Sequence, residues 1–322
     1  MSELKIQENV ILAPYTTFRI GGPAKYFFEA KSKEELIQAI EWAKNNRVRY
    51  FILGAGSNIL ISDKGFDGLV IKVKNEKLKI KNYISKFKII EAGAGVRLNK
   101  LVEIGLKRGL SGLEWAVGIP GTLGGAVRGN AGAMGHSISE AIKSVEVLDT
   151  KNKQILETKN FLNCDCLFDY RNSVFKHNRN LVILAAKLEL KPGDQEESRN
   201  KIQEYLEKRK NQPSEPSAGS IFKNPLIANR HEFEHKFHEY QPIPFINSQI
   251  PAGWLIEQCG LKGYKIGQAQ VSSKHANFIV NLGKAKAEEV TILINLIKKK
   301  VRDKFGIRLE EEIQYLGDGH QP

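Results

Sequence analysis

The chain of 322 residues is poor in cysteine and methionine, and it has no long apolar run. Its three cysteines, Cys164, Cys166 and Cys259, cannot form a disulfide framework, and they include no C-x-x-C pair. No segment approaches the roughly 18 apolar residues that a membrane-spanning helix needs. The amino-terminal segment MSELKIQENV is polar and lacks the apolar core of a secretory signal peptide. We therefore expect a cytoplasmic protein with no membrane segment.

Acidic residues are also in short supply, because 36 Asp and Glu stand against 49 Lys and Arg and leave a net charge of +13. Such an excess suggests a nucleic-acid-binding module. Between Ile71 and Ile90, however, lysines alternate with Ile, Val and Leu, which is typical of β-strands with one solvated face. We favour this structural interpretation and expect no nucleic-acid partner. The charge remains suited to small polyanionic ligands such as nucleotides.

Hydrophobic periodicity predicts a mixture of helices and strands along the whole chain. Helices are expected at 32–46, 97–109 and 287–305, and a polar helix within 192–216. Strands are expected at 49–61 around a glycine turn, 68–73, 86–96, 143–150, 181–191, 273–283 and 307–317. Strict βαβ alternation is absent, so the predicted fold class is α+β. The shift to a polar, proline-containing composition at 192–216 predicts a domain boundary there.

Three glycine-rich segments stand out: Gly54–Asn58, Gly93–Gly95 and the run from Gly118 to Gly135, which has seven glycines in eighteen positions. The Rossmann pattern G-x-G-x-x-G fails, because Ile59 stands where the third glycine is needed. Glycine turns can still present backbone N–H groups to a phosphate. A purely structural turn explains one such motif equally well. Three in one half of the chain predict a pyrophosphate and a flat ring system bound between backbone loops.

Eight segments carry a resemblance to a known family: TTFRIGGPA, LGAGSNILISDKGFDGLVI, GLSGLEWAVGIPGTLGGAVRGNAGA, FDYRNSVFK, PSAGSIFKNP, AGWLIEQCGLKGYKIG, VSSKHANFIVN and GIRLEEEIQYLG. In these segments and in their order, the chain resembles the UDP-N-acetylenolpyruvoylglucosamine reductase (MurB) family of bacterial peptidoglycan synthesis. The resemblance covers essentially the whole chain, from Thr16 to Gly317.

The resemblance implies an FAD-binding fold of the para-cresol methylhydroxylase and vanillyl-alcohol oxidase type. Two α+β subdomains, expected at 1–75 and 76–195, would hold FAD without a covalent bond, and an α+β domain at 196–322 would bind the substrate. The cofactor-binding residues that it implies are Gly54, Ala55, Gly56, Ser57, Asn58, Gly118, Ile119, Gly121, Thr122, Gly124, Gly125, Asn130 and Ala131. The glycines would let the backbone approach flavin and phosphate closely.

The family's reaction implies that NADPH reduces FAD and that hydride then passes to UDP-N-acetylglucosamine enolpyruvate, giving UDP-N-acetylmuramate. By resemblance, Arg171 holds the substrate carboxylate, and a permanently charged, planar guanidinium suits that task. Ser220 is the implied proton donor, with Ser217 nearby as a structural decoy. A hydroxyl is a weak acid, so Lys223 or a water is expected to assist it. Lys223 and Asn224 are also expected to bind substrate.

Glu312 is the second stabilising residue implied by the resemblance. Strict strand alternation disagrees, because it places Glu311 on the apolar side with Leu309 and Ile313. We prefer Glu312, since the polar face of this strand would line the site, and keep Glu311 as the alternative.

The chain departs from the family pattern at Ala55, Gly129 and Gln268, without loss of a catalytic group. The 49 residues from Arg171 to Ser220 leave no room for the tyrosine-bearing loop of some members. The longer segment 226–251 is an alternative cover for the substrate. Its residues His231, His235 and His238 could suggest a metal site, but their loose spacing favours a solvated loop or helix, and we expect no metal.

Two other functions are weighed against the reductase. A related oxidase of the same FAD fold would use molecular oxygen, and a nucleic-acid-binding module would purify without colour and bind DNA in a salt-sensitive way. For the reductase we expect FAD and NADPH as cofactors, a monomer with no obligate protein partner, and a role in cell-wall synthesis, and therefore in cell shape and division.

Overall fold

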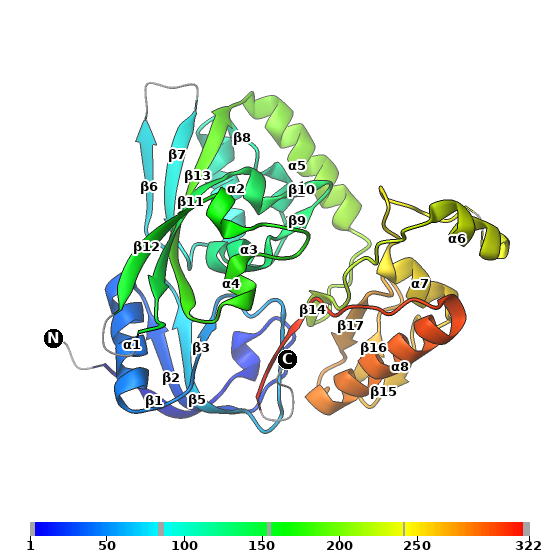
Figure 1. Cartoon of the computed structure of the whole chain (residues 1–322), viewed down its shortest axis with the longest axis horizontal. Helices are drawn as coiled ribbons and strands as arrows, with labels where there is room; N and C mark the ends of the chain where they lie inside the picture. Colours follow the sequence, from blue (N-terminus) through cyan, green and yellow to red (C-terminus); the bar gives the residue numbers. More distant parts are fainter. Residues whose placement is uncertain (1–3, 83–86, 153–155, 241, 318–322) are drawn as a thin grey trace. The chain divides into compact units, whose positions relative to one another are not determined.

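The structure is a computed structural model that describes residues 4–82, 87–152, 156–240 and 242–317 (Figure 1). Its contacts divide the chain into two compact units. Unit 1 comprises Met1–Val10, Ala24–Ala55 and Asp67–Lys210, and unit 2 comprises Ile11–Pro23, Gly56–Phe66 and Asn211–Pro322. The last division falls inside the stretch where composition changes, while the three-part division 1–75, 76–195 and 196–322 stays a prediction.

The first sheet of unit 1 has the strand order β1-β2-β5-β3. Its strands are β1 (Gln7–Ile11), β2 (Pro23–Ala30), β5 (Phe66–Val73) and β3 (Tyr50–Leu53), and β3 runs parallel to β5. Helix α1 (Lys33–Asn45) begins where the Ser32 hydroxyl accepts the Glu35 N–H at 3.1 Å, and a serine followed three residues later by a glutamate is typical of a helix start. Its expected apolar stripe, with Leu36 and Ile40 at the centre, is buried.

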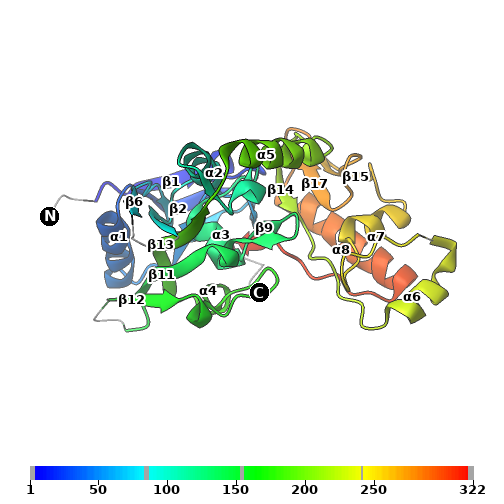
Figure 2. The same ribbon diagram turned by 90° about the horizontal axis from the view of Figure 1, so that it is seen from above.

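The larger sheet of unit 1 is antiparallel, with the strand order β12-β11-β13-β7-β6. Its strands are β12 (Glu157–Leu162), β11 (Ile142–Asp149), β13 (Leu181–Pro192), β7 (Lys88–Gly93) and β6 (Leu78–Asn82), and the short β8 (Leu110–Ser111) also pairs with β13. The helices α2 (Leu98–Lys107) and α5 (Gln195–Arg209) pack against each other. The short helix α3 (Leu123–Gly129) lies beside β13 in both Figure 1 and Figure 2.

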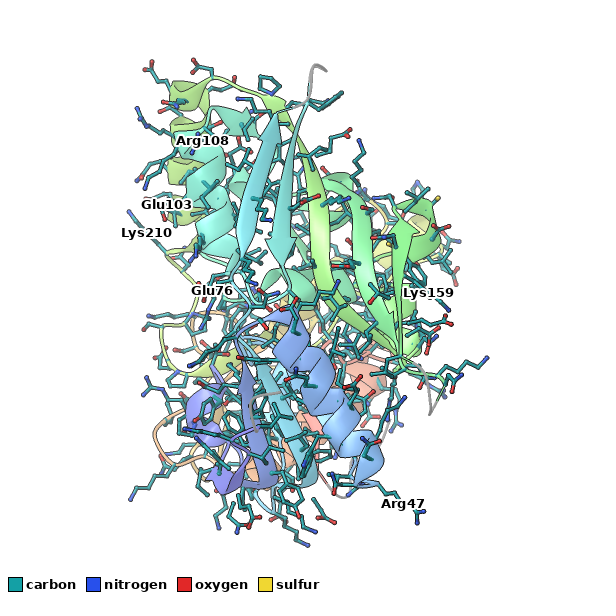
Figure 3. The ribbon with its side chains drawn as sticks, turned by 90° about the vertical axis from the view of Figure 1, so that its left-hand side faces the viewer. Arg47, Glu76, Glu103, Arg108, Lys159 and Lys210 are labelled. Atoms are coloured by element: carbon teal, nitrogen blue, oxygen red, sulfur yellow. The ribbon has the colours of Figure 1, made fainter. Side chains whose placement is uncertain are left out.

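The lysine-rich segment from Ile71 to Ile90 contributes to three strands instead of one continuous pattern. Strand β5 ends at Val73, β6 begins at Leu78 and β7 begins at Lys88, while 83–86 lie outside the described residues. Lys74 is solvated as expected. Lys72 is buried, with only 7% of its surface exposed. The alternation pattern, which predicted a solvated lysine, was therefore wrong at this position. Figure 3 shows other charged side chains of unit 1, such as Glu103 of α2 and Lys159 of β12, which are exposed.

Unit 2 is built on the antiparallel sheet β14-β17-β16-β15. Its strands are β14 (Ser217–Ser220), β17 (Phe278–Asn281), β16 (Ala269–Val271) and β15 (Lys265–Ile266), and a separate parallel pair joins β4 (Ile59–Ile61) to β18 (Gln314–Leu316). Helix α8 (Ala287–Phe305) buries the stripe that periodicity predicts, including Leu293 and Ile297. Gly306 ends it with φ +71°, a left-handed conformation that glycine adopts without strain.

The remaining elements are short. They are α4 (Val174–His177), α6 (Arg230–Lys236), α7 (Ala252–Gln258), β9 (Gly132–Ala133) and β10 (His136–Ser137). The expected strand at 307–317 is reduced to β18 and an isolated bridge at Glu311. Within the described ranges, the structure has no helix with both the length and the apolar character needed to span a bilayer.

Candidate functional site

In unit 1, residues 54–55 of the first glycine-rich segment lie close to the other two segments. The Gly124 N–H donates to the Ala94 carbonyl at 2.9 Å, which joins the long run to the second glycine turn. A Cβ atom on Gly54 would lie 2.6 Å from the Thr122 hydroxyl, so the first turn also contacts the long run. Segments that are distant in the sequence therefore form one glycine-rich region.

Several of these glycines are required by packing within the protein itself. A Cβ on Gly124 would lie 2.8 Å from the Cβ of Ala94, and a Cβ on Gly93 would lie 2.6 Å from the Asn75 carbonyl. Such distances are too short for real carbon atoms, so side chains at these positions would displace the backbone. Tight packing between segments of this chain thus explains part of the glycine content. Contact of the flavin with the residues expected for it stays a prediction. These residues are Gly118, Ile119, Gly121, Thr122, Gly124 and Gly125.

The glycine-rich region also presents backbone donors. In unit 1, the N–H groups of Ala55, Gly121 and Thr122 meet no acceptor among the described residues. Successive N–H groups of this kind form a concave site for an anion. These donors fit the diphosphate of a dinucleotide cofactor.

Arg209 is a feature of this region that sequence reasoning missed. It lies at the end of α5, where its Cδ is 3.2 Å from the position of a Cβ on Gly118. Its Nε is buried and has no hydrogen-bond partner in the described part of the chain. A buried, unpaired guanidinium donor suits an anionic ligand. Nothing in the sequence indicated it, because Arg209 belongs to a polar helix whose other charged residues are solvated.

Arg171 occupies a tight turn in unit 1. The backbone groups of Asp169 and Asn172 bond to each other in both directions, at 3.2 and 3.0 Å, and Arg171 between them has φ +52°. Its guanidinium donates to the Gly132 carbonyl of β9 at 2.7 Å. A Cβ on Gly132 would lie 3.1 Å from the same guanidinium, so the absence of a side chain there makes room for it. The turn and β9 together fix the direction of the Arg171 side chain.

Asn130 connects helix α3 to the arginine turn. It ends α3 with φ +44°, is 6% exposed, and donates from its amide to the Asp169 carbonyl at 2.8 Å. Its amide oxygen accepts the Ser139 N–H at 3.3 Å. These bonds give Asn130 a positioning role for Arg171. Its direct contact with the cofactor, like that of Ala131, stays a prediction.

In unit 2, the structure places Ser220 and Glu312 on neighbouring segments. The Ile221 N–H donates to the Asn277 carbonyl at 2.8 Å, and the Ile221 carbonyl accepts the Glu312 N–H at 2.7 Å. The Asn58 amide donates to the Glu312 carbonyl at 3.1 Å. Backbone pairing therefore fixes both candidate residues, and it holds Asn58 beside them.

Ser220 follows a bulge in β14, where Gly219 adopts φ +75°. Its side chain is half-buried, and its hydroxyl has no hydrogen-bond partner among the residues that the structure describes. Ser217, the expected decoy, is held by Thr17, which bonds both its N–H (3.1 Å) and its carbonyl (2.7 Å). These bonds engage only the backbone of Ser217, so the choice of Ser220 over Ser217 stays a prediction.

Glu311 is engaged in a local ion pair. Its carboxylate accepts from the Lys298 ammonium at 2.8 Å and from the Tyr315 hydroxyl at 2.5 Å. Burial and this hydrogen bond raise the pKa of Tyr315, so the phenol stays a donor. Leu309 and Ile313 are buried as alternation predicts, and Lys298 and Tyr315 explain how a carboxylate is accommodated on that side. This arrangement favours Glu312 as the catalytic residue of the pair.

Lys223 and Asn224 both have partners within unit 2. The Lys223 ammonium binds the Glu310 carboxylate at 2.5 Å, and the Asn224 amide oxygen accepts the Ala252 N–H at 3.0 Å at the start of α7. No described hydrogen bond joins Lys223 to Ser220. The expected relay between them has no support here, and substrate contacts of Lys223 and Asn224 stay predictions.

Comparison with known proteins identifies the family. Residues 24–159 match the profile of an FAD-binding domain, and residues 212–316 match the C-terminal domain of UDP-N-acetylenolpyruvoylglucosamine reductase. A UDP-N-acetylenolpyruvoylglucosamine reductase from Synechococcus sp. (strain JA-3-3Ab) is 41% identical over 99% of this chain and 93% of its own length. One from Caldicellulosiruptor bescii is 42% identical over 97% of this chain and 90% of its own length. The chain belongs to the UDP-N-acetylenolpyruvoylglucosamine reductase family.

A solved structure agrees with this MurB assignment. The crystal structure of the reductase from Thermus caldophilus matches with a TM-score of 0.76 and 31% identity, over 98% of this chain and all of that one. The expected fold class is confirmed: an α+β protein with an FAD-binding part and the C-terminal domain of the MurB family.

The structure also accounts for two departures from the MurB pattern. Gln268 is exposed, and its N–H donates to the Glu289 carboxylate at 2.9 Å. A Cβ on Gly129 would meet nothing within 4 Å, so a side chain would fit at this position. Neither position disturbs the groups described above.

The long segment 226–251 packs by aromatic contacts within unit 2. Phe233, Phe237 and Tyr240 all contact Phe305 at the end of α8, with ring centroids 6.4, 5.1 and 5.6 Å apart. The sequence analysis expected a solvated loop or helix here and did not use the i, i+4, i+7 spacing of these three aromatic residues.

The histidines of this segment lie on or next to α6, and His231, His235 and His238 are exposed. Among the described residues no group of three histidine, cysteine, aspartate or glutamate side chains is placed to bind a metal.

Proposed function

We propose that this protein catalyses the NADPH-dependent reduction of UDP-N-acetylglucosamine enolpyruvate to UDP-N-acetylmuramate. Its relatives carry the name of that reductase and match almost the whole chain. Bound FAD would supply the hydride carrier between NADPH and the enolpyruvyl group. We further propose that the protein acts in the cytoplasm as a monomer without an obligate protein partner, within peptidoglycan precursor synthesis.

The glycine-rich region would hold FAD. The unpaired N–H groups of Ala55, Gly121 and Thr122 would bind the diphosphate, and Ser57 and Asn58 would add side-chain donors. Direct contacts are proposed for Gly54, Gly56, Gly118, Ile119, Gly124, Gly125, Asn130 and Ala131. Arg209 supplies the cation that a dianionic diphosphate requires.

Arg171 would bind the carboxylate of the enolpyruvyl group. Its guanidinium is directed by the bond to Gly132, and the turn held by Asn130 limits its movement. A fixed cation of this kind stabilises negative charge that spreads into the carboxylate during reduction.

Ser220 would donate the proton that completes the lactyl ether. Its half-buried hydroxyl is uncommitted in the described structure, and it regains its proton from solvent after each turnover. Glu312 on the paired segment would stabilise charge next to the substrate carboxylate. The observation that carries this assignment is the backbone pairing of Ile221 with Glu312.

The proposal is tested with the purified full-length protein. We expect a flavin absorption spectrum, and oxidation of NADPH only when the UDP-linked enolpyruvyl sugar is present. Production of one UDP-N-acetylmuramate per NADPH supports the reductase. Oxygen consumption with an alcohol substrate and no need for NADPH would instead identify an oxidase, and a colourless protein would refute the FAD assignment.

A further inference from the structure

Lys72 is a buried lysine next to the candidate cofactor turn. It lies near the end of β5, is 7% exposed, and donates from its ammonium to the Gly54 carbonyl at 2.5 Å. Burying an ammonium disfavours its charged form unless hydrogen bonds and nearby negative charge compensate for the lost water.

The charges around Lys72 are mainly positive. Burial, followed by the nearby Arg97 and Lys74, lowers the pKa of Lys72 to about 8, and only Glu29 acts in the opposite direction. Glu29 is itself paired with Lys74 at 2.7 Å. The local electrostatic balance therefore favours an added anion.

The Gly54 carbonyl and the Ala55 N–H belong to one planar peptide group. A cation bound to the oxygen of a peptide draws electron density from its nitrogen and makes the N–H a stronger donor; hydrogen-bond chains polarise one another by about 10–30% per bond. The Ala55 N–H has no acceptor in the described structure. It is thus a polarised donor placed for a ligand.

We propose that Lys72 is a positioning residue for the cofactor diphosphate: its ammonium polarises the Gly54–Ala55 peptide, and its charge offsets that of the bound phosphates. The proposal rests on the FAD assignment made above. Lys72 does not touch the cofactor in this scheme but acts through the turn that does.

The proposal predicts that the protein takes up protons when FAD binds, and this uptake can be measured. A bound diphosphate stabilises the ammonium form, so FAD binding raises the pKa of Lys72, and near pH 8 the protein takes up roughly half a proton. FAD affinity accordingly falls as pH rises above 8, where the free protein has lost the charge.

The experiment uses full-length protein from which FAD has been removed. FAD is titrated back at pH 7 into wild type, Lys72→Met and Lys74→Met, and proton uptake at pH 8 is obtained calorimetrically in two buffers of different ionisation enthalpy. We expect Lys72→Met to weaken FAD binding about tenfold or more, the effect of a lost charge-assisted hydrogen bond. Lys74→Met, which removes a surface ion pair, should change it less than about threefold.

Proton uptake by wild type that disappears in Lys72→Met supports the proposal. Absence of uptake in wild type between pH 7 and 9.5 overturns it, and this measurement does not depend on how the variant folds. Equal loss of FAD affinity in Lys72→Met and Lys74→Met also overturns it. A wild-type protein that binds no FAD at all refutes the proposed function as well, so the two failures are distinguishable.

Discussion

Each of the two units carries candidate catalytic side chains, and the protein fixes them by different means in the two units. Arg171 in unit 1 occupies a left-handed turn that depends on the side chain of Asn130 and on the bare backbone of Gly132. Ser220 and Glu312 in unit 2 are held by main-chain hydrogen bonds through Ile221. The first arrangement should be sensitive to side chains outside the reaction, whereas the second should tolerate replacement of the reacting side chain itself.

Ser220→Ala should have the largest effect on the reaction and the least on the fold. Main-chain pairing leaves the segment in place, while loss of a positioned proton donor typically slows the chemical step about 100-fold to 10,000-fold. Stopped-flow measurements should show slow reoxidation of the reduced enzyme by the enolpyruvyl substrate and nearly normal reduction by NADPH. Ser217→Ala is the control. Equal slowing of both half-reactions would contradict the view that main-chain pairing keeps this segment in place when the Ser220 side chain is replaced.

Glu312→Gln and Glu311→Gln test the same segment with neighbouring residues. Glutamine keeps the shape and removes the carboxyl group, so Glu312→Gln should slow substrate reduction at least about 100-fold. Glu311→Gln weakens a partly exposed ion pair with Lys298, and its effect on the rate should stay below about threefold. The measurement is again reoxidation by substrate. A severe defect in Glu311→Gln alone would make Glu311 the catalytic residue.

Asn130→Gly tests the turn that depends on side chains. Glycine accepts φ +44° but removes the hydrogen bonds to Asp169 and Ser139, each worth about 1 kcal/mol. We expect KM for the enolpyruvyl substrate to rise about tenfold, with a smaller change in the reduction of FAD by NADPH. Gly129→Ala is the matched control, since its Cβ meets nothing within 4 Å. Unchanged KM in Asn130→Gly would leave Arg171 positioned by Gly132 alone.

Gly124→Val separates packing from cofactor contact. Its side chain would collide with Ala94, and such overpacking costs about 1–3 kcal/mol. We expect a lower melting temperature even without FAD, together with reduced flavin occupancy. A variant that is as stable as wild type without FAD but cannot bind it would show that flavin contact alone requires this glycine. Full stability and full occupancy would contradict both explanations.

His275 gives the main-chain arrangement a weak dependence on pH. Its ring nitrogen accepts the Asn277 N–H at 3.3 Å, and Asn277 bonds the backbone of Ile221 and Phe222. Burial lowers the pKa of His275 below its ordinary 6.5, so the unfolded chain binds more protons and stability falls as pH decreases below about 6.5. Thermal unfolding from pH 5 to 8 should show this decrease, and His275→Asn should reduce it. An unchanged pH dependence in the variant would exclude His275 as the cause of the decrease in stability at low pH.

The sequence predicted what depends on neighbours along the chain. Local patterns predict the apolar stripes of helices α1 and α8, the start of α1 at Ser32 and the end of α8 at Gly306. They also reveal the glycine-rich segments. The sequence did not predict what depends on distant partners. Alternation placed Lys72 in solvent because it carries no information about the Gly54 turn that covers it. The preference for Glu312 over Glu311 likewise draws on the contacts of Glu311 with Lys298 and Tyr315, and it stays a prediction.

Unit 2 is assembled from three stretches of chain, and this has a consequence for synthesis on the ribosome. Asn58 and Glu312, which are joined by a hydrogen bond, are 254 residues apart in the sequence. Thr17 and its hydrogen-bond partner Ser217 are 200 residues apart. Contacts between residues so far apart in the sequence form late, because the long intervening loop must be closed at a cost in entropy. The segments Ile11–Pro23 and Gly56–Phe66 therefore remain without their partners until the carboxyl-terminal residues have emerged. A nascent chain stalled before residue 310 would keep β4 as an unpaired strand, open to chaperones and to aggregation.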